Sequence, residues 1–169
     1  LLAKPLAAGL PLSATLIPAK INRLLHAGDH GSTFGGGPVT CAVANLVVER
    51  ILEPGFLGEV REKGAFLRER LSRIASSVPL CGGTGAEANE GGSGSAAGIR
   101  GLGMLAGIVI DTGKGGAEIM GKIVSGARDA GLLVLRSGEN VIRLAPPLII
   151  TKKELEEGCS ILESVLRTL

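Results

Sequence analysis

The pattern of apolar and polar positions predicts three helices in the first half of the chain. Residues 56–75 place charged and apolar side chains at helical spacing, which predicts an amphipathic surface helix. Residues 39–52 are apolar on most sides and polar only near their end, which predicts a buried helix. Residues 18–25 begin with proline, which favours the first turn of a helix, so a short helix is predicted there.

The second half of the chain carries two more helical patterns, each with a signal for its terminus. Residues 117–130 are amphipathic and are followed by Gly131, which favours the left-handed backbone of a helix C-cap. The last pattern begins at Thr151, and Glu154 follows three residues later. This spacing predicts a capping box, in which the two side chains accept from free backbone N–H groups.

Short apolar runs between these helices predict strands. Residues 99–110 indicate a strand or a strand pair with interior glycines, and residues 132–135 and 141–144 predict a hairpin around the turn SGEN. Residues 1–17 predict two short strand segments joined by turns. The C-terminal two thirds therefore predicts an α+β region, with helices on one face of a small antiparallel sheet.

Breaks in the pattern suggest the organisation of the chain. Pro54 and Gly55 interrupt two helical patterns and mark the predicted domain boundary. The segment 80–97 is low in complexity and predicts a flexible loop. The chain starts at Leu1, inside an apolar run, so we expect its 169 residues to be a piece of a larger protein.

Composition narrows the classes of partner. The formal net charge is +2, so no strong field attracts nucleic acid or an anionic membrane. The chain has no Trp and no Tyr, which removes most side chains that stack on bases. No apolar stretch reaches the roughly 20 residues of a spanning helix. We expect small molecules or another protein as partners, and neither nucleic acid nor a membrane.

The candidate metal ligands are sparse. The chain has three widely spaced cysteines without a CxxC motif, at Cys41, Cys81 and Cys159. This spacing is typical of reduced thiols rather than of disulfides or a zinc site. His26, Asp29 and His30 form one loose cluster in a glycine-rich loop, so no metal site is predicted.

Lys4 is the first candidate for chemistry. It stands alone in an apolar run, and Pro5 directly after it favours an extended or turn conformation over a helical one. Desolvation of such an amine would make it a nucleophile toward carbonyls, the starting point of Schiff-base chemistry. The alternative is a lysine whose stem is buried while its ammonium group reaches water.

The loop HGSTFGGGP is the second candidate. Its glycines let the backbone approach a ligand closely, Ser32 and Thr33 add hydroxyl groups, and a helix begins at Pro38. Free N–H groups ahead of a helix favour an anion, most commonly phosphate. The alternative is an ordinary glycine-rich helix entry.

Arg143 is the third candidate. It ends an apolar strand before a double proline, so its planar guanidinium would project from a rigid edge and suits a carboxylate. The alternative is a structural ion pair.

Two other glycine motifs are excluded as nucleotide sites. The spacing in GLGMLAG is one residue too long for a dinucleotide fingerprint, and an apolar strand pattern follows it. GAEIMGK has P-loop spacing, but Ile123 stands where Ser or Thr would hold magnesium.

The chain resembles the class III pyridoxal-phosphate aminotransferases, and especially their acetylornithine-using members. The similar blocks occur in the same order: AKPLAAGLPLSA, GDHGSTFGGGP, IRGLGMLAGI and NVIRLAPPLIIT. The resemblance covers the whole chain and implies an α/β enzyme of fold type I, similar to aspartate aminotransferase. Residues 1–54 would end the large pyridoxal-phosphate-binding domain, and residues 55–169 would form the small C-terminal α+β domain.

The resemblance also implies roles for individual residues. Lys4 would be the catalytic Schiff-base lysine that binds the pyridoxal 5'-phosphate aldehyde. Thr33 would hydrogen-bond the cofactor phosphate across the interface of a homodimer. Ser32 would contact the acylated substrate, and Arg143 a substrate carboxylate. The implied reaction moves an amino group from N-acetylornithine to 2-oxoglutarate, giving glutamate, in arginine biosynthesis.

The chain departs from the family pattern in three ways. Gly37 stands where the family usually has Asn, which loosens the helix entry. The stretch 82–95 is longer than the family connection and is interpreted as a surface insertion. The family's N-terminal part, with its ring and substrate contacts, is absent, so the isolated residues are expected to be inactive.

Two alternatives remain from the sequence: an aminotransferase for ornithine or another ω-amino acid, and a non-catalytic interaction module. Pro5 after the lysine resembles organellar eukaryotic members, where bacterial ones commonly have Gly. The expected compartment is the mitochondrial matrix or the chloroplast, with the cytoplasm as the alternative.

Overall fold

The computed structural model describes residues 1–81, 98–111 and 116–169. These residues form two compact units, Leu1–Leu57 and Gly58–Leu169. The unit boundary lies close to the predicted break at Pro54 and Gly55. The loop predicted at 80–97 falls almost entirely outside the described residues, as does the insertion at 82–95. Among the described helices, none is both long enough and apolar enough to cross a membrane.

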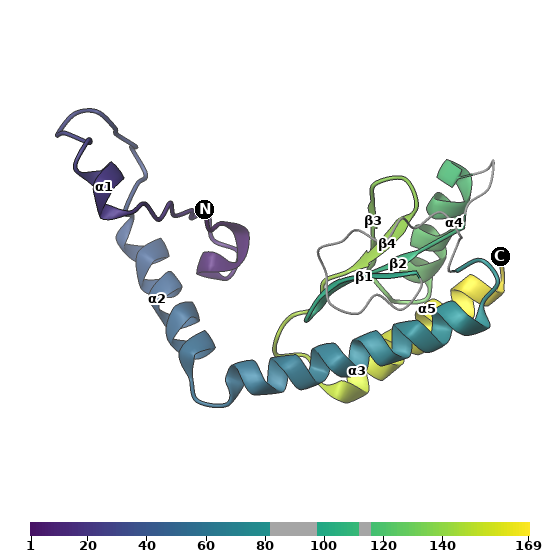
Figure 1. Cartoon of the computed structure of the whole chain (residues 1–169). Coiled ribbons are helices and arrows are strands. Elements are labelled where there is room, and N and C mark those ends of the chain that lie inside the picture. The colour runs from purple at the N-terminus through teal and green to yellow at the C-terminus, as the bar shows by residue number, and fades with distance from the viewer. Residues whose placement is uncertain (82–97, 112–115) are drawn as a thin grey trace. The chain divides into compact units, whose positions relative to one another are not determined.

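Unit 1 is built from three helical segments. They are the 3₁₀ turn η1 (Lys4–Ala7), the short helix α1 (Ala19–Asn22) and the helix α2 (Pro38–Leu52) (Figure 1). The short helix after Pro18 and the helix predicted at 39–52 are confirmed. The two strand segments predicted in residues 1–17 are reduced to a single antiparallel bridge between Leu2 and Ala14.

The prediction that α2 is buried is wrong for unit 1. Ala44 is its only buried residue, while Val39, Leu46 and Leu52 are 71%, 65% and 71% exposed. Within the unit η1 packs against α2, so one small contact covers a helix that is apolar nearly all round. An apolar pattern predicts which surface should be buried, but it does not supply the covering element.

Unit 2 is an antiparallel sheet with three helices. Its strands are β1 (Ile99–Leu102), β2 (Leu105–Val109), β3 (Leu135–Ser137) and β4 (Val141–Leu144), in the order β1-β2-β4-β3. Its helices are α3 (Phe56–Ser77), which starts at the end of unit 1, α4 (Gly116–Asp129) and α5 (Lys152–Arg167) (Figure 1). The predicted α+β region, the strand pair at 99–110 and the three helices are confirmed.

One hydrophobic core holds unit 2 together. Alternate residues of the central strands, Ala106 and Ile108 of β2 and Ile142 of β4, point to the same face and are at most 5% exposed. They pack with buried side chains of α3, α4 and α5, of which Leu71 and Leu162 are fully buried. Residues from helices far apart in sequence therefore share one core against one face of the sheet.

The local signals for the helix termini are confirmed. Gly131 takes φ +90°, its N–H bonds to Arg128 O, and the N–H of Leu132 bonds to Ala127 O, which is the Schellman arrangement. Thr151 Oγ1 accepts from the N–H of Glu154, and the Glu154 carboxylate accepts from the N–H of Thr151 at 2.8 Å, which completes the capping box.

The predicted hairpin forms, but its first strand is shifted. Residues 132–135 were expected to pair, whereas β3 begins at Leu135 and pairs through Ser137 with Val141. The reason is the helix terminus: the N–H of Leu132 bonds to the end of α4, and Val134 is buried in the core. Residues that follow a helix C-terminus into the core can be as apolar as a strand, so the sequence pattern alone does not distinguish the two.

Candidate active site

Lys4 lies on a turn that its neighbours hold in place. The bridge between Leu2 and Ala14 closes the segment with two backbone hydrogen bonds of 2.8 Å, and the N–H of Ala8 bonds to Pro5 O at 3.2 Å. Lys4 takes φ +57°, so it leaves right-handed helical geometry as expected, but it does so in the left-handed region rather than in the extended region that proline favours for the residue before it. Lys4 therefore lies at a change of chain direction, where η1 begins.

The Lys4 side chain is exposed, and in the described part of the chain it makes no hydrogen bond or ion pair. Desolvation, which the apolar sequence around it suggested, is not provided by unit 1. The side chain is instead accessible, which a covalent contact with a carbonyl ligand also requires.

The loop between α1 and α2 keeps several backbone donors open. The N–H of Gly35 bonds to Ser32 O, while the N–H groups of Thr33, Phe34 and Gly36 have no acceptor among the described residues. Gly36 takes φ +71°, a conformation that glycine adopts without strain. Ser32 and Thr33 are exposed beside these donors. The arrangement provides N–H and hydroxyl donors for an anion ahead of α2.

The entry to α2 bears out part of the expectation for Gly37. As N-cap it contributes no side-chain hydrogen bond, where an Asn would offer one. The turn is kept by two other bonds to Gly37 O, from the N–H of Cys41 at 3.0 Å and from the Thr40 hydroxyl at 2.9 Å. The helix begins at Pro38 as predicted, without a side-chain cap.

Arg143 lies on β4 with Gly107 of β2 and Leu135 of β3 as its neighbours across the sheet. Its side chain is exposed and has no ion pair or hydrogen bond to any described residue. The alternative of a structural ion pair finds no partner in the described ranges.

The predicted site residues are divided between the units. Lys4, Ser32 and Thr33 belong to unit 1, and Arg143 belongs to unit 2. No hydrogen bond joins Lys4 to Ser32 or Thr33 among the described residues. In the described ranges, each unit thus presents its own polar groups that have no partner in the protein.

Sequence reasoning missed a lysine that fixes the segment after Arg143. Lys63 Nζ on α3 donates to Leu148 O at 2.6 Å, and Glu62 pairs with Lys152 at 3.5 Å. Together they tie the double-proline segment to α3. No sequence signal links residues 85 positions apart, so only the tertiary structure identifies this contact.

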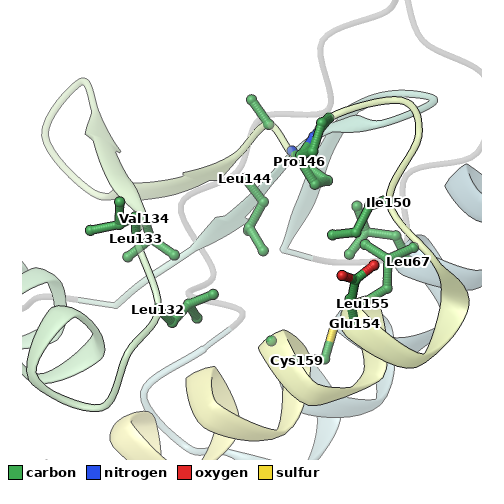
Figure 2. A pocket seen from close by; sticks show the side chains of 13 residues that line it. Leu67, Leu132, Leu133, Val134, Leu144, Pro146, Ile150, Glu154, Leu155 and Cys159 are labelled. Carbon is green, nitrogen blue, oxygen red and sulfur yellow. The ribbon is translucent and has the colours of Figure 1, made fainter.

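A separate apolar pocket of about 260 Å³ lies between α5 and the segments that flank β3 and β4 (Figure 2). Its lining includes Leu67, Leu132, Leu155 and Cys159, and none of the predicted site residues. Burial raises the pKa of the Cys159 thiol to about 11, although the nearby Arg70 charge opposes the shift. The thiol is therefore protonated at neutral pH, so the pocket has no evident nucleophile.

Comparison with known proteins decides the family. Residues 1–166 match the family described as Aminotransferase class-III. The chain belongs to this family.

Among curated class III relatives, the mitochondrial acetylornithine aminotransferase of Alnus glutinosa is 38% identical over 169 residues, which are 99% of this chain and 33% of that protein. The acetylornithine aminotransferase of Vibrio vulnificus is 36% identical over 168 residues, covering 99% of this chain and 37% of that protein. The chain therefore spans about a third of the length of these relatives.

Solved class III structures agree with the fold. The acetylornithine aminotransferase of Elizabethkingia anophelis matches 97% of this chain and 37% of its own, with 28% identity and a TM-score of 0.78. An ornithine aminotransferase of Toxoplasma gondii, with partial occupancy of PLP at its active site, matches 96% of this chain and 35% of its own, with 27% identity and a TM-score of 0.77. The predicted family and fold type I are confirmed, and the chain is a partial α/β structure with a small antiparallel sheet.

Proposed function

We propose that this class III chain contributes the catalytic lysine and the phosphate-contacting loop of an acetylornithine aminotransferase. The enzyme would move an amino group from N-acetylornithine to 2-oxoglutarate in arginine biosynthesis, with pyridoxal 5'-phosphate as its cofactor. The observation that carries the proposal is the exposed Lys4 amine, which stands on a fixed turn and has no partner in the described ranges. The names of the relatives support the choice of substrate.

The described residues fit a ligand that has both an aldehyde and a phosphate. Lys4 offers a free amine, and the loop offers open N–H groups at Thr33 and Phe34 together with the Thr33 hydroxyl. When bound, pyridoxal phosphate supplies the aldehyde and an electron-withdrawing ring. Lys4 would hold the aldehyde carbon in its own subunit's site, and Thr33 would hold the phosphate in the site of the other subunit.

Lys4 would also move the proton in the reaction. Once the substrate amine has taken its place, Lys4 Nζ removes a proton from the substrate carbon that bears the amino group and later returns one, acting first as base and then as acid. The bridge between Leu2 and Ala14 closes the segment that carries Lys4. Ser32 would contact the acylated substrate, and Arg143 would orient a substrate carboxylate with its planar fork.

The decisive experiment uses a polypeptide of full family length that carries these residues. Added cofactor should give a visible absorption band, borohydride should bleach it, and peptide mapping should find the label on Lys4. Lys4→Ala should lose the band and the activity, whereas Lys20→Ala, which alters another exposed lysine of unit 1, should keep both. A labelled residue other than Lys4 would refute the assignment.

We also propose a homodimer in which Thr33 serves the site of the other subunit. Subunits with Lys4→Ala and subunits with Thr33→Ala would then complement each other, because one site of the hybrid would hold an intact lysine and an intact threonine. The expected result is recovery of about half the activity per dimer, by the principle that one site of two is complete. No recovery in verified hybrids would place both residues in the same site.

The isolated 169 residues should bind the cofactor poorly and be inactive. Unit 1 buries very few side chains, so little holds Lys4 and the loop in one arrangement. Equilibrium dialysis with the cofactor measures this, and tight stoichiometric binding would contradict it.

Ornithine is the second candidate for the amino donor. The specific observation is the match to the Toxoplasma gondii ornithine aminotransferase, whose TM-score is nearly that of the acetylornithine enzyme. Comparing kcat/KM for the two donors on the full-length enzyme decides between them. A preference for N-acetylornithine supports the proposal, and a preference for ornithine replaces it.

We propose the mitochondrial matrix as the compartment. Pro5 after the lysine supports an organellar form, and relatives from Alnus glutinosa and Dictyostelium discoideum are named as mitochondrial. Fractionation of cells that express the full-length protein tests the location. Recovery with chloroplast or cytosolic markers would reject the mitochondrial assignment.

A further inference from the structure

The apolar pocket between α5 and the segments that flank β3 and β4 has a floor that belongs to the core of unit 2. Leu67 of α3 and Leu155 and Cys159 of α5 line the pocket and are 1%, 4% and 1% exposed. Close packing with the rest of the core fixes these side chains. The floor of the pocket is therefore formed without a ligand.

The double-proline segment forms a second fixed wall. Pro146 and Pro147 line the pocket, and each ring restricts its own backbone φ. The N–H of Ile150 bonds to Pro147 O at 3.0 Å, which closes the turn after the prolines. Lys63 of α3 donates to Leu148 O at 2.6 Å and ties the same segment to the helix below. This wall is therefore held by hydrogen bonds as well as by the proline rings.

The volume of the pocket suits a small molecule. It measures about 260 Å³, whereas an apolar cavity of roughly 150 Å³ is enough to bind benzene. Drug-sized ligands occupy pockets of about 300–1,000 Å³. Leu133 lines the pocket and is 86% exposed, so the pocket can be entered from solvent. One ring with a short chain, or an aliphatic chain of similar size, fits this space.

Glu154 supplies the charge of the pocket. It is the one charged residue among the described residues that line the pocket, and its carboxylate rises from α5 toward it (Figure 2). Its Oε2 accepts from the N–H and the hydroxyl of Thr151, at 2.8 and 2.7 Å, which orients the carboxylate. Its Oε1 has no partner in the described part of the chain. One oxygen thus holds the group in place, and the other remains for a cation.

The chemistry of the lining selects the charge of the ligand. The Thr151 N–H and hydroxyl lower the pKa of Glu154, so the carboxylate is ionised at neutral pH. Burial raises the pKa of the Cys159 thiol to about 11, so the thiol is neutral there. A matching ligand therefore has an apolar body and a positive end. A carboxylate on the ligand would be repelled by Glu154, so amino acids match the pocket poorly.

We propose that this pocket binds a primary ammonium compound that has a short apolar body and no carboxylate. The apolar body would lie against Leu67 and Leu155, and the ammonium group would donate to Glu154 Oε1. The remaining N–H donors of the ammonium group would stay in water at the mouth of the pocket. The site rests on the shape and charge of unit 2 and does not depend on the proposed aminotransferase function.

The test titrates the 169-residue chain with 2-phenylethylamine and follows the backbone amide signals by NMR. No cofactor is added, because a primary amine would react with its aldehyde. The signals of Leu155, Gly158 and Cys159 should shift along one common saturation curve. The neutral 2-phenylethanol should bind about three-fold more weakly, because it lacks the ion pair. The anionic 3-phenylpropanoate should bind about ten-fold more weakly or not at all, because Glu154 repels it.

Glu154→Gln removes the charge and keeps a residue that can complete the capping box. It should weaken the binding of 2-phenylethylamine about three-fold, the usual size for an exposed ion pair, and leave 2-phenylethanol nearly unchanged. Glu157→Gln is the matched control, because Glu157 is an exposed carboxylate of the same helix that does not line the pocket. This control should change neither affinity.

Gly158→Met fills the pocket. A Cβ at Gly158 would lie 3.3 Å from Leu132 Cδ1, and both residues line the pocket, so a side chain at this position enters it. The affinity for 2-phenylethylamine should fall about ten-fold or more, because the flexible methionine takes the space of the ligand. Gly121→Met on α4 is the matched control, because a Cβ there meets nothing within 4 Å. It should change the affinity less than about two-fold. Circular dichroism verifies the fold of each variant.

Three results would overturn the proposal. Equal affinity for 2-phenylethylamine and 3-phenylpropanoate would show that Glu154 selects no charge. Shifts confined to residues outside the pocket would place the amine elsewhere. Loss of binding in a polypeptide of full family length would show that another part of the protein fills the pocket. The titration of the unchanged chain gives the first two results even if Gly158→Met does not fold. Each result leaves the aminotransferase proposal standing, and a failed label on Lys4 leaves the pocket proposal untouched.

Discussion

Units 1 and 2 differ most in how much of their apolar surface they bury. Unit 2 packs three helices onto a four-stranded sheet around one contiguous core. In unit 1 the buried apolar residues are Ala7, Ala44 and Phe56, while the exposed apolar residues of α2 include Val39, Leu46, Val48 and Leu52. Unit 2 contains the packing that can stabilise it, whereas unit 1 does not within its own residues.

This difference bears on the proposed chemistry. The residues proposed for the cofactor, Lys4 and Thr33, lie in the unit with almost no core, and Arg143, proposed for a substrate carboxylate, lies in the unit with a contiguous one. A rigid scaffold fixes a site better than a poorly packed one. The cofactor site should therefore need further contacts to unit 1.

The largest expected effect comes from truncating a leucine in each unit. Leu71 of α3 is fully buried, so Leu71→Ala should lower the free energy of unfolding by about 2–5 kcal/mol. Leu46 of α2 is 65% exposed, and Leu46→Ala should change it by less than about 0.5 kcal/mol. Urea unfolding followed by circular dichroism measures both. Similar losses at both positions would erase the contrast between the units.

Two glycines with similar positive φ angles sharpen the contrast between the units. Gly101 in unit 2 has φ +106°, and an added Cβ would lie 2.1 Å from Leu105 O, whereas Gly28 in unit 1 has φ +98° with nothing within 4 Å. Gly101→Ala should lower the free energy of unfolding by about 3 kcal/mol, from strain plus a backbone shift. Gly28→Ala carries the strain alone and should cost about 1 kcal/mol. The same urea titration applies, and equal losses would show that packing around Gly101 is not decisive.

The three thiols report the stability of each unit directly. Burial raises the pKa of both Cys81 and Cys159 to about 11, so these thiols of unit 2 stay protonated and covered at pH 8. Cys41 of unit 1 is only partly buried. It should be alkylated about a hundred-fold faster than the other two, because they react only after unit 2 opens. Mass spectrometry of timed iodoacetamide reactions gives the rates, and urea should make them similar. Equal native rates would show that unit 2 opens as readily as unit 1.

The smallest effects concern the helix entries. Thr151→Ala removes the cap of α5 and should cost about 1 kcal/mol, while Gly37→Asn should stabilise the uncapped α2 by about 0.3 kcal/mol. Thermal unfolding of the two variants compares them. A larger change from Gly37→Asn than from Thr151→Ala would reverse the expected order.

The cap of α5 also predicts a dependence on pH. Hydrogen bonds from the Thr151 N–H, and then from its hydroxyl, lower the pKa of Glu154 below its ordinary 4.5. A carboxyl whose pKa is lower in the folded state contributes stability above its unfolded pKa and loses it as the pH falls. The stability difference between wild type and Glu154→Gln should thus be constant from pH 5 to 7 and shrink below about pH 4.5. A difference that stays constant down to pH 3 would contradict the bond to the carboxylate.

Much of the local structure follows from the sequence because short-range chemistry specifies it. Three helix termini lie where the sequence predicts them: α2 begins at Pro38, α4 ends before Gly131, and the pair Thr151 and Glu154 caps the start of α5. These signals can be predicted because each acts on backbone groups close to it in the sequence. Pro5 likewise predicts that Lys4 leaves right-handed helical geometry, but it does not predict the left-handed φ that Lys4 takes. The order of the family blocks also identified the class III family from sequence.

The tertiary structure decided the features that depend on distant residues. The start of β3 moved because residues after α4 complete its C-terminus and pack in the core, which an apolar run does not reveal. The exposure of α2 depends on which elements cover it, and the contact from Lys63 to Leu148 joins positions far apart in sequence.

The same division applies to the candidate sites. Sequence determined that Lys4, Thr33 and Arg143 carry suitable chemistry, because residue type and immediate neighbours set what a side chain can do. Only the fold decided that Gly107 and Leu135 flank Arg143 across the sheet, because strand register is fixed by the shared core of the sheet and not by any local signal.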